Sequence, residues 1–165
     1  VVFEIIKGGG ASAVYHAINS DDVDLIMQHP VTSIASDGPL TVFGVGSPYP
    51  RTYGTSARVL GSYVRDRNIL SLEEAVRKMT SLPAQILSIK GRGLIKEGYF
   101  ADIAIFDPKT IIDKATFEDP HQYAVGVSSV IVNGVIVIDQ GIHNGNKPGK
   151  VLRGPGYIQP RLSNG

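Results

Sequence analysis

Cysteine is absent from this chain of 165 residues. Disulfides, thiolate nucleophiles and cysteine-bound metals are therefore excluded within it, whereas the compartment stays open, cytoplasmic or periplasmic. The sequence also has no apolar run of ~18 residues, which argues against a membrane-spanning helix. Net charge is only +1, so no basic surface of the size that nucleic acid requires is expected.

What the chain does contain points to a folded α/β protein. Apolar residues make up 42% of the sequence, enough for a core, and 19 Gly and 10 Pro supply many turns. The first seven residues, Val-Val-Phe-Glu-Ile-Ile-Lys, include neither Met nor an N-cap residue. Their pattern fits the last turns of a buried helix or a short strand. We expect a piece of a longer protein that begins inside an element.

The first half alternates strand and helix patterns. Residues 11–16 and 31–35 are typical of buried strands, and a helix with Ser20 as N-cap is expected between them, ending by about His29 before Pro30. This is the βαβ unit of a parallel sheet. Three further helices are predicted. One covers residues 55–67, one begins at the capping box with Ser71 as N-cap, and one covers residues 83–87.

From Gly91 the pattern changes to strands. Residues 101–106, 127–132 and 135–138 are predicted strands. Asn133-Gly134 between the last two is typical of a type I′ hairpin. We therefore expect a unit over residues 1–90, a β-unit over 91–153 and a tail over 154–165.

Asp37 is the first candidate for chemistry. It follows the predicted strand 31–35, and in βα-barrels the carboxyl ends of the strands carry the catalytic residues. The alternative is a turn former, because Asp-Gly is common in turns.

Arg51 is the second candidate and is expected in a loop that Pro48 and Pro50 stiffen. A guanidinium held there can grip a carboxylate with two hydrogen bonds. The alternative is a surface ion pair with Asp66 or Glu73.

The four histidines are scattered along the chain, at positions 16, 29, 121 and 143. None has His-x-His or His-x3-His spacing, so no metal site can be identified within this chain. His16 ends the first predicted strand and can face the same edge as Asp37. A structural role is the alternative for it.

At this point the sequence resembles the carboxyl-terminal part of the N-acyl-D-amino-acid deacylases (D-aminoacylases) of the amidohydrolase superfamily. Several stretches between residues 1 and 153 carry the resemblance: Tyr15-His16-Ala17-Ile18, Ala35-Ser36-Asp37-Gly38, Pro48 to Thr55 with Arg58-Val59-Leu60, Lys78 to Ala84, Gly93-Leu94-Ile95, Gly98 to Ile103 and Val130 to Gly134. The stretch around Arg51 is the specific one, whereas the later stretches occur in many amidohydrolases.

The resemblance implies a fold, a reaction and roles. The fold would comprise the last strands and helices of a (β/α)8 amidohydrolase barrel, followed by part of a small β-sandwich. The reaction would be hydrolysis of an N-acyl-D-amino acid by a zinc-activated water. Asp37 would take the proton of that water and pass it to the leaving amine, and it can also touch a metal. Arg51 would hold the α-carboxylate of the substrate.

Two departures from the family pattern concern the substrate site. Tyr49 stands where the family triplet has His, which adds Tyr49 to the substrate-binding set, and the interval from Asp37 to Arg51 is a few residues longer. The family's other zinc ligands would precede this chain, so the isolated chain is expected to be inactive. It would find its partners in the rest of its own barrel or in self-association.

Two other functions remain open at the level of sequence. One is a related amidohydrolase that acts on cyclic amides or imides. The other is a non-catalytic module. Comparing the turnover of N-acetyl-D-amino acids with that of cyclic imides distinguishes a deacylase from a cyclic amidase. Metal analysis tests whether the chain is a non-catalytic module.

Overall fold

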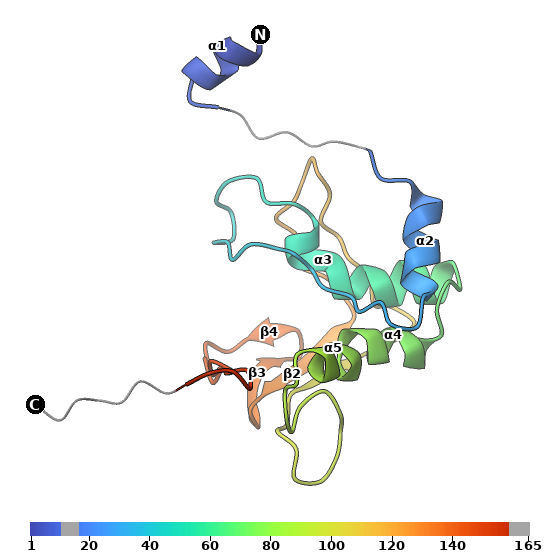
Figure 1. Ribbon diagram of the computed structural model, residues 1–165. Helices are drawn as coiled ribbons and strands as arrows, with labels where there is room; N and C mark the ends of the chain where they lie inside the picture. The colour runs from blue at the N-terminus through green and yellow to red at the C-terminus, as the bar shows by residue number, and fades with distance from the viewer. Residues whose placement is uncertain (11–16, 159–165) are drawn as a thin grey trace, which may run out of the picture.

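The computed structural model describes residues 1–10 and 17–158, with helices in the first half and a sheet in the second (Figure 1). The helices are α1 Val2–Lys7, α2 Ser20–Gln28, α3 Arg51–Arg58, the π-helix η1 Val59–Asp66, α4 Leu72–Met79 and α5 Ser81–Ile86. The strands are β1 Ile103–Phe106, β2 Val127–Val132, β3 Val135–Asp139 and β4 Ile142–His143. No helix in these described ranges is long and apolar enough to cross a membrane.

The first two helices depart in detail from the predictions. α1 is helical but buries none of its residues, so the expectation of a buried helix is wrong for it. The N-cap of α2 is Asn19 and not Ser20, because the Asn19 side chain accepts a hydrogen bond of 2.8 Å from the Asp21 N–H. The helix ends before Pro30, as predicted.

The predicted strand over residues 31–35 is not formed. Val31 lies in a turn and residues 32–35 have no regular secondary structure in the part of the chain that the structure describes, and the Ile34 N–H donates to the Lys78 carbonyl at 3.0 Å. A parallel strand needs a neighbouring strand to satisfy its backbone. The partner predicted over residues 11–16 lies outside the described residues.

The helix predicted over residues 55–67 begins earlier, at Arg51, and continues into η1. Two glycines on it allow close packing against the segment that follows β1. A Cβ at Gly61 would lie 2.4 Å from the Ile111 carbonyl oxygen, and one at Gly54 would lie 2.5 Å from the Asp113 Cβ. Side chains at these positions would push the two segments apart.

α4 begins where the capping box predicts. The Ser71 hydroxyl accepts a hydrogen bond of 3.2 Å from the Glu74 N–H. The Glu74 carboxylate does not reach back to the N-cap and binds Arg77 instead. α5 begins at Ser81, two residues before the predicted start at Pro83.

The β-unit is a four-stranded antiparallel meander in the order β1-β2-β3-β4. The predicted hairpin is confirmed, with Val132 opposite Val135 and positive φ at both turn residues, 48° at Asn133 and 80° at Gly134. Such a φ pair defines a type I′ turn. β4 has only two residues and was not predicted.

The core lies between the helices and one end of the sheet. Its buried members are Ala57, Val59, Leu60, Leu70, Ala75 and Ile111. Phe106 of β1 and Val127 of β2 pack against this cluster. The core therefore joins α3, η1 and α4 to the sheet.

Candidate active site

Asp37 lies at the end of the segment 31–37, and its backbone is constrained. Its φ of 46° is left-handed, which is uncommon for a residue other than glycine. The next residue, Gly38, packs so closely on α3 that a Cβ there would lie 2.8 Å from the Thr52 Cα. The Asp37 carboxylate remains accessible, with 86% of the side chain exposed. The backbone thus presents a solvent-facing carboxylate next to the start of α3.

Arg51 is the first residue of α3 and not a loop residue, so that prediction needs correction. Pro50 precedes it as N-cap, and the fixed φ of proline suits this position. The Arg51 Nη2 atom lies 3.1 Å from Asp37 Oδ2. The structure therefore brings together the two residues that the sequence singled out. The alternative partner Asp66 pairs with Arg65 instead.

Tyr49 joins this pair through its ring. The Arg51 guanidinium carbon lies 4.9 Å from the centre of the Tyr49 ring, and the Tyr49 and Phe117 rings are nearly perpendicular, with their centres 6.2 Å apart. A guanidinium stacked on an aromatic ring is held in orientation and keeps its hydrogen-bonding edge free. Asp37, Arg51 and Tyr49 all line one pocket of about 580 Å³, together with Ala35, Ser36, Gly38 and Pro39.

A second, larger pocket of about 1000 Å³ adjoins the first and shares Ser36 and Arg51 with it. Its lining is mostly apolar and comes from α3, α4, the segment 93–95 and β1. Ser36 and Arg51 therefore stand where the two pockets meet.

Lys78 anchors the segment that leads to Asp37, a role the sequence did not reveal. Its side chain is fully buried, and its ammonium group donates to the carbonyls of His29 and Thr32, the latter at 3.1 Å. Glu74 Oε1 lies 3.5 Å from the same nitrogen. Three acceptors around three donor hydrogens satisfy the buried charge.

Arg77 adds a second anchor from the same helix. It donates to the Pro30 carbonyl at 2.6 Å and to both carboxylate oxygens of Glu74 at 2.7 Å. The hydrogen bond from Arg77 is the main cause that lowers the pKa of Glu74 to about 2. Glu74 therefore stays ionised and keeps both basic side chains of α4 directed at the chain before Asp37.

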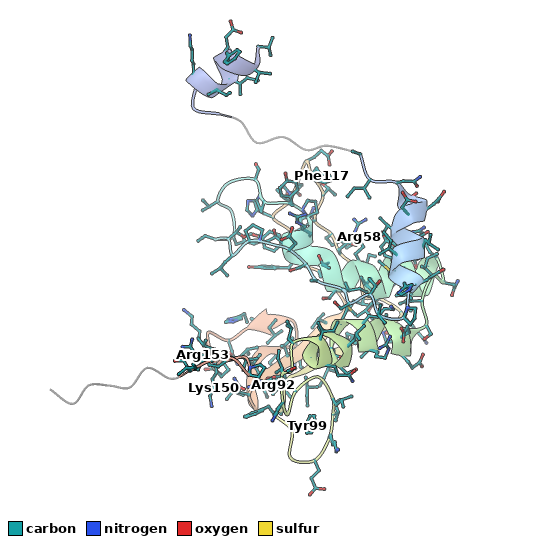
Figure 2. All side chains as sticks on the ribbon, viewed as in Figure 1. Arg58, Arg92, Tyr99, Phe117, Lys150 and Arg153 are labelled. Carbon is teal, nitrogen blue, oxygen red and sulfur yellow. The ribbon has the colours of Figure 1, made fainter. Side chains whose placement is uncertain are left out.

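The segment after β1 brings further residues to the site. Arg58 of α3, labelled in Figure 2, pairs with Asp113 at 2.7 Å, and this pair fastens the segment that carries Phe117 and His121. His121 contacts the chain between Pro39 and Tyr49. His29 contributes its carbonyl to Lys78, His143 lies on β4, and His16 lies outside the described residues.

Within this pocket, Asp37 is the one side chain that we consider as a zinc ligand. No group of three or more His, Asp or Glu side chains suited to a metal occurs in residues 1–10 and 17–158. Asp37 fits as a single ligand, because its carboxylate is exposed and Arg51 contacts only its Oδ2 oxygen. Zinc sites need three or more protein ligands, so the others would come from outside the described residues.

Comparison with known proteins identifies the family of this chain. Residues 10–138 match the model of the amidohydrolase family, and the chain belongs to this family. It is 44% identical over 142 residues to a D-aminoacylase of Alcaligenes xylosoxydans xylosoxydans, a match that covers 86% of this chain and 29% of that protein.

Solved structures are also similar to this chain. A D-aminoacylase crystal structure aligns with a TM-score of 0.79 at 40% identity, covering 87% of this chain and 30% of that one. The zinc and phosphonate complex of N-acyl-D-glutamate deacylase from Bordetella bronchiseptica aligns with a TM-score of 0.70 at 41% identity, covering 74% and 25%. The chain thus spans under a third of the length of these relatives.

Proposed function

We propose that this chain forms one side of the active site of a zinc-dependent N-acyl-D-amino-acid deacylase, which hydrolyses a linear amide to a carboxylate and a free D-amino acid. The observation that supports this most directly is the contact of 3.1 Å between Arg51 and Asp37. In an N-acyl amino acid the α-carboxylate and the leaving nitrogen are bonded to the same carbon. A cation for the first and a proton donor for the second must therefore be neighbours.

In this proposal Asp37 is the general base and then the general acid. It accepts a proton from the attacking water and delivers it to the amide nitrogen as the C–N bond breaks. Zinc, when bound, supplies the Lewis acid that activates the water and polarises the carbonyl. Asp37 is exposed toward the pocket and is held by a constrained backbone, which suits a group that must keep its position during proton transfer.

Arg51 binds the substrate α-carboxylate in this proposal. Its pair with Asp37 is partly exposed, and such pairs contribute only about 0–1 kcal/mol. An arriving carboxylate can therefore take over the guanidinium, which leaves Asp37 free for the proton. Tyr49 stacks on Arg51 and orients its planar fork. A carboxylate fixed in this way pins one substituent of the chiral carbon and favours one enantiomer.

The experiment is a substrate panel. A zinc-loaded enzyme that contains this chain and the region its relatives have before it would be assayed on N-acetyl-D-amino acids, their L-enantiomers and cyclic imides. We expect release of amine from the D-substrates and loss of activity on zinc removal, with recovery when zinc is returned. Turnover of cyclic imides alone would establish the related cyclic amidase, and no turnover with a fully occupied metal site would favour a non-catalytic module.

A further inference from the structure

The chain between Pro39 and Tyr49 forms a loop at the mouth of the pocket, named here the glycine loop (residues 39–49). Both of its ends line the pocket that holds Asp37 and Arg51. Its middle turns through Gly44 and Gly46, whose φ angles are 82° and 72°. A loop whose two ends border a site changes the shape of that site when its middle moves.

One side chain from a distant part of the sequence holds the middle of this loop. His121 Nδ1 accepts a hydrogen bond of 3.1 Å from the Gly44 N–H, and His121 Nε2 donates one of 2.9 Å to the Gly46 carbonyl. The Tyr53 hydroxyl lies 3.1 Å from the same Nδ1 atom. Phe43 of the loop packs its ring against His121 at 5.5 Å and stacks on Tyr123 at 4.7 Å.

This geometry requires a neutral imidazole with its proton on Nε2. The Gly44 N–H can only donate, so Nδ1 must carry a free lone pair. The Tyr53 hydroxyl then donates to the same atom. A proton on Nδ1 would face the Gly44 N–H and remove its acceptor, whereas the Tyr53 hydroxyl could turn and accept from the protonated ring. The titratable neighbours of the ring are Tyr53 from α3 and, across Phe43, Tyr123. Within the described residues, no Asp, Glu, Lys or Arg side chain pairs with His121 in a hydrogen bond or ion pair that would hold it charged.

We propose that His121 is a positioning residue: it holds the glycine loop against the pocket when neutral and releases the loop when protonated. Histidine is the side chain that ordinarily changes charge between about pH 5 and 8. Release would displace Pro39 and Tyr49, and with Tyr49 the ring that orients Arg51. Substrate binding would then weaken in acid. This last step rests on the proposed function, whereas the holding of the loop does not.

The structural arm of the test is amide hydrogen exchange of peptides within residues 39–49, in the same zinc-loaded enzyme. The variants are His121→Gln, which stays neutral with one acceptor and one donor, His121→Ala, which has neither, and His143→Gln as the matched control on β4. Exchange is expressed as protection relative to the free peptide at about pH 8 and about pH 5. We expect wild-type and control protection to fall on the order of tenfold in acid, and His121→Ala to be low at both pH values.

The kinetic arm uses KM. The proposal expects KM for N-acetyl-D-amino acids to rise in acid in the wild type and in the control, and this rise to be absent from both His121 variants. Loop protection that is equal in wild type and His121→Ala, or that keeps its pH dependence in His121→Ala, would overturn the proposal. The exchange result decides the role of His121 even if no deacylase activity is found, so its failure and that of the proposed function are distinguishable.

Discussion

At the scale of single residues, the proposed function requires the ion pair between Asp37 and Arg51 to separate when substrate binds. Asp37 and Arg51 neutralise each other in the absence of substrate, yet both remain accessible. If this pair were buried, separating Asp37 from Arg51 would cost much free energy, because a charge removed from water needs a partner that stays in place. Both residues were predicted as site residues from the sequence around them. Their contact could not be predicted, since it depends on α3 beginning at Arg51.

Replacing Asp37 by Asn tests the proton-transfer role. The amide cannot take a proton from water, so we expect kcat to fall by about 10²–10⁴-fold. Steady-state kinetics on an N-acetyl-D-amino acid would measure this, with zinc content and circular dichroism as controls for metal loading and folding. A kcat within about tenfold of wild type would remove Asp37 from the mechanism.

Replacing Arg51 by Lys tests the carboxylate-binding role. Lysine keeps the charge but loses the two-pronged hydrogen bond and the stacking on Tyr49. We expect KM to rise about tenfold or more for N-acyl-D-amino acids. The control substrate is an N-acyl amine without a carboxylate, whose KM should be unchanged. Equal losses on both substrates would show that Arg51 has a structural role instead.

At the scale of elements, α4 places Asp37 from a distance. The sequence predicts where this helix begins, because a capping box acts within one turn. It does not show that Lys78 and Arg77 reach the carbonyls of the segment 29–32. Those contacts join residues more than 40 positions apart, and only the packing of α4 on this segment creates them.

Replacing Lys78 by Met tests this anchor. The carbon stem is kept, but the carbonyls of His29 and Thr32 lose their buried donor. We expect the free energy of unfolding to fall by about 1–3 kcal/mol in urea denaturation. The matched control is Lys109→Met, because Lys109 is exposed and its replacement should change stability little. Equal stability of the two variants would contradict the anchoring role.

In the β-unit, Asp102 forms an ion pair with Arg92 and accepts a hydrogen bond from the Asn133 N–H. Burial alone would raise the pKa of Asp102, but hydrogen bonds from the Asn133 N–H and the Arg92 guanidinium outweigh it and lower that pKa. Asn133 also donates to the Pro148 carbonyl at 2.7 Å. Asp102 thus ties the hairpin turn to the loop before β1.

This pKa shift predicts a pH dependence of stability. A carboxyl whose pKa is lower in the folded state stabilises the fold above its unfolded pKa, and this contribution is lost as pH falls through the folded pKa. We expect the free energy of unfolding to decline below about pH 4. The decline should be shallower in Asp102→Asn, because its amide does not titrate. Urea denaturation at several pH values would measure both, and identical slopes would contradict the prediction.

At the scale of the whole molecule, the chain exposes much apolar surface. Leu40 is fully exposed, Leu25 is 70% exposed and Ile26 is 58% exposed. Among residues 1–10 and 17–158, the edge strands of the sheet are β1 and β4, each paired on one side. Unpaired edges and large apolar surfaces favour association. A chain that spans under a third of its relatives' length would bury such surface against the remaining region.

The 165-residue polypeptide alone is therefore expected to self-associate and to be inactive. Sedimentation velocity over a range of concentrations, with zinc analysis and a deacylase assay, would measure this. The control is an enzyme that includes the preceding region, which should sediment as a defined species. A monodisperse folded monomer that binds zinc and hydrolyses N-acetyl-D-amino acids would contradict the expectation.

The sequence by itself determined the local features of this protein. The hairpin at Asn133-Gly134, the start of α4 at Ser71 and the end of α2 before Pro30 all depend on contacts within a few residues, which the chain specifies directly. The resemblance to amidohydrolases could also be recognised from the sequence, because the stretch around Arg51 is specific to the deacylases of that superfamily. Tertiary structure decided the rest: the start of α3, the absence of a strand over 31–35, the burial of Lys78 and the grip of His121 on a distant loop. Each depends on which partner the folded chain brings near, because a backbone or buried charge adopts the state in which its hydrogen bonds are satisfied.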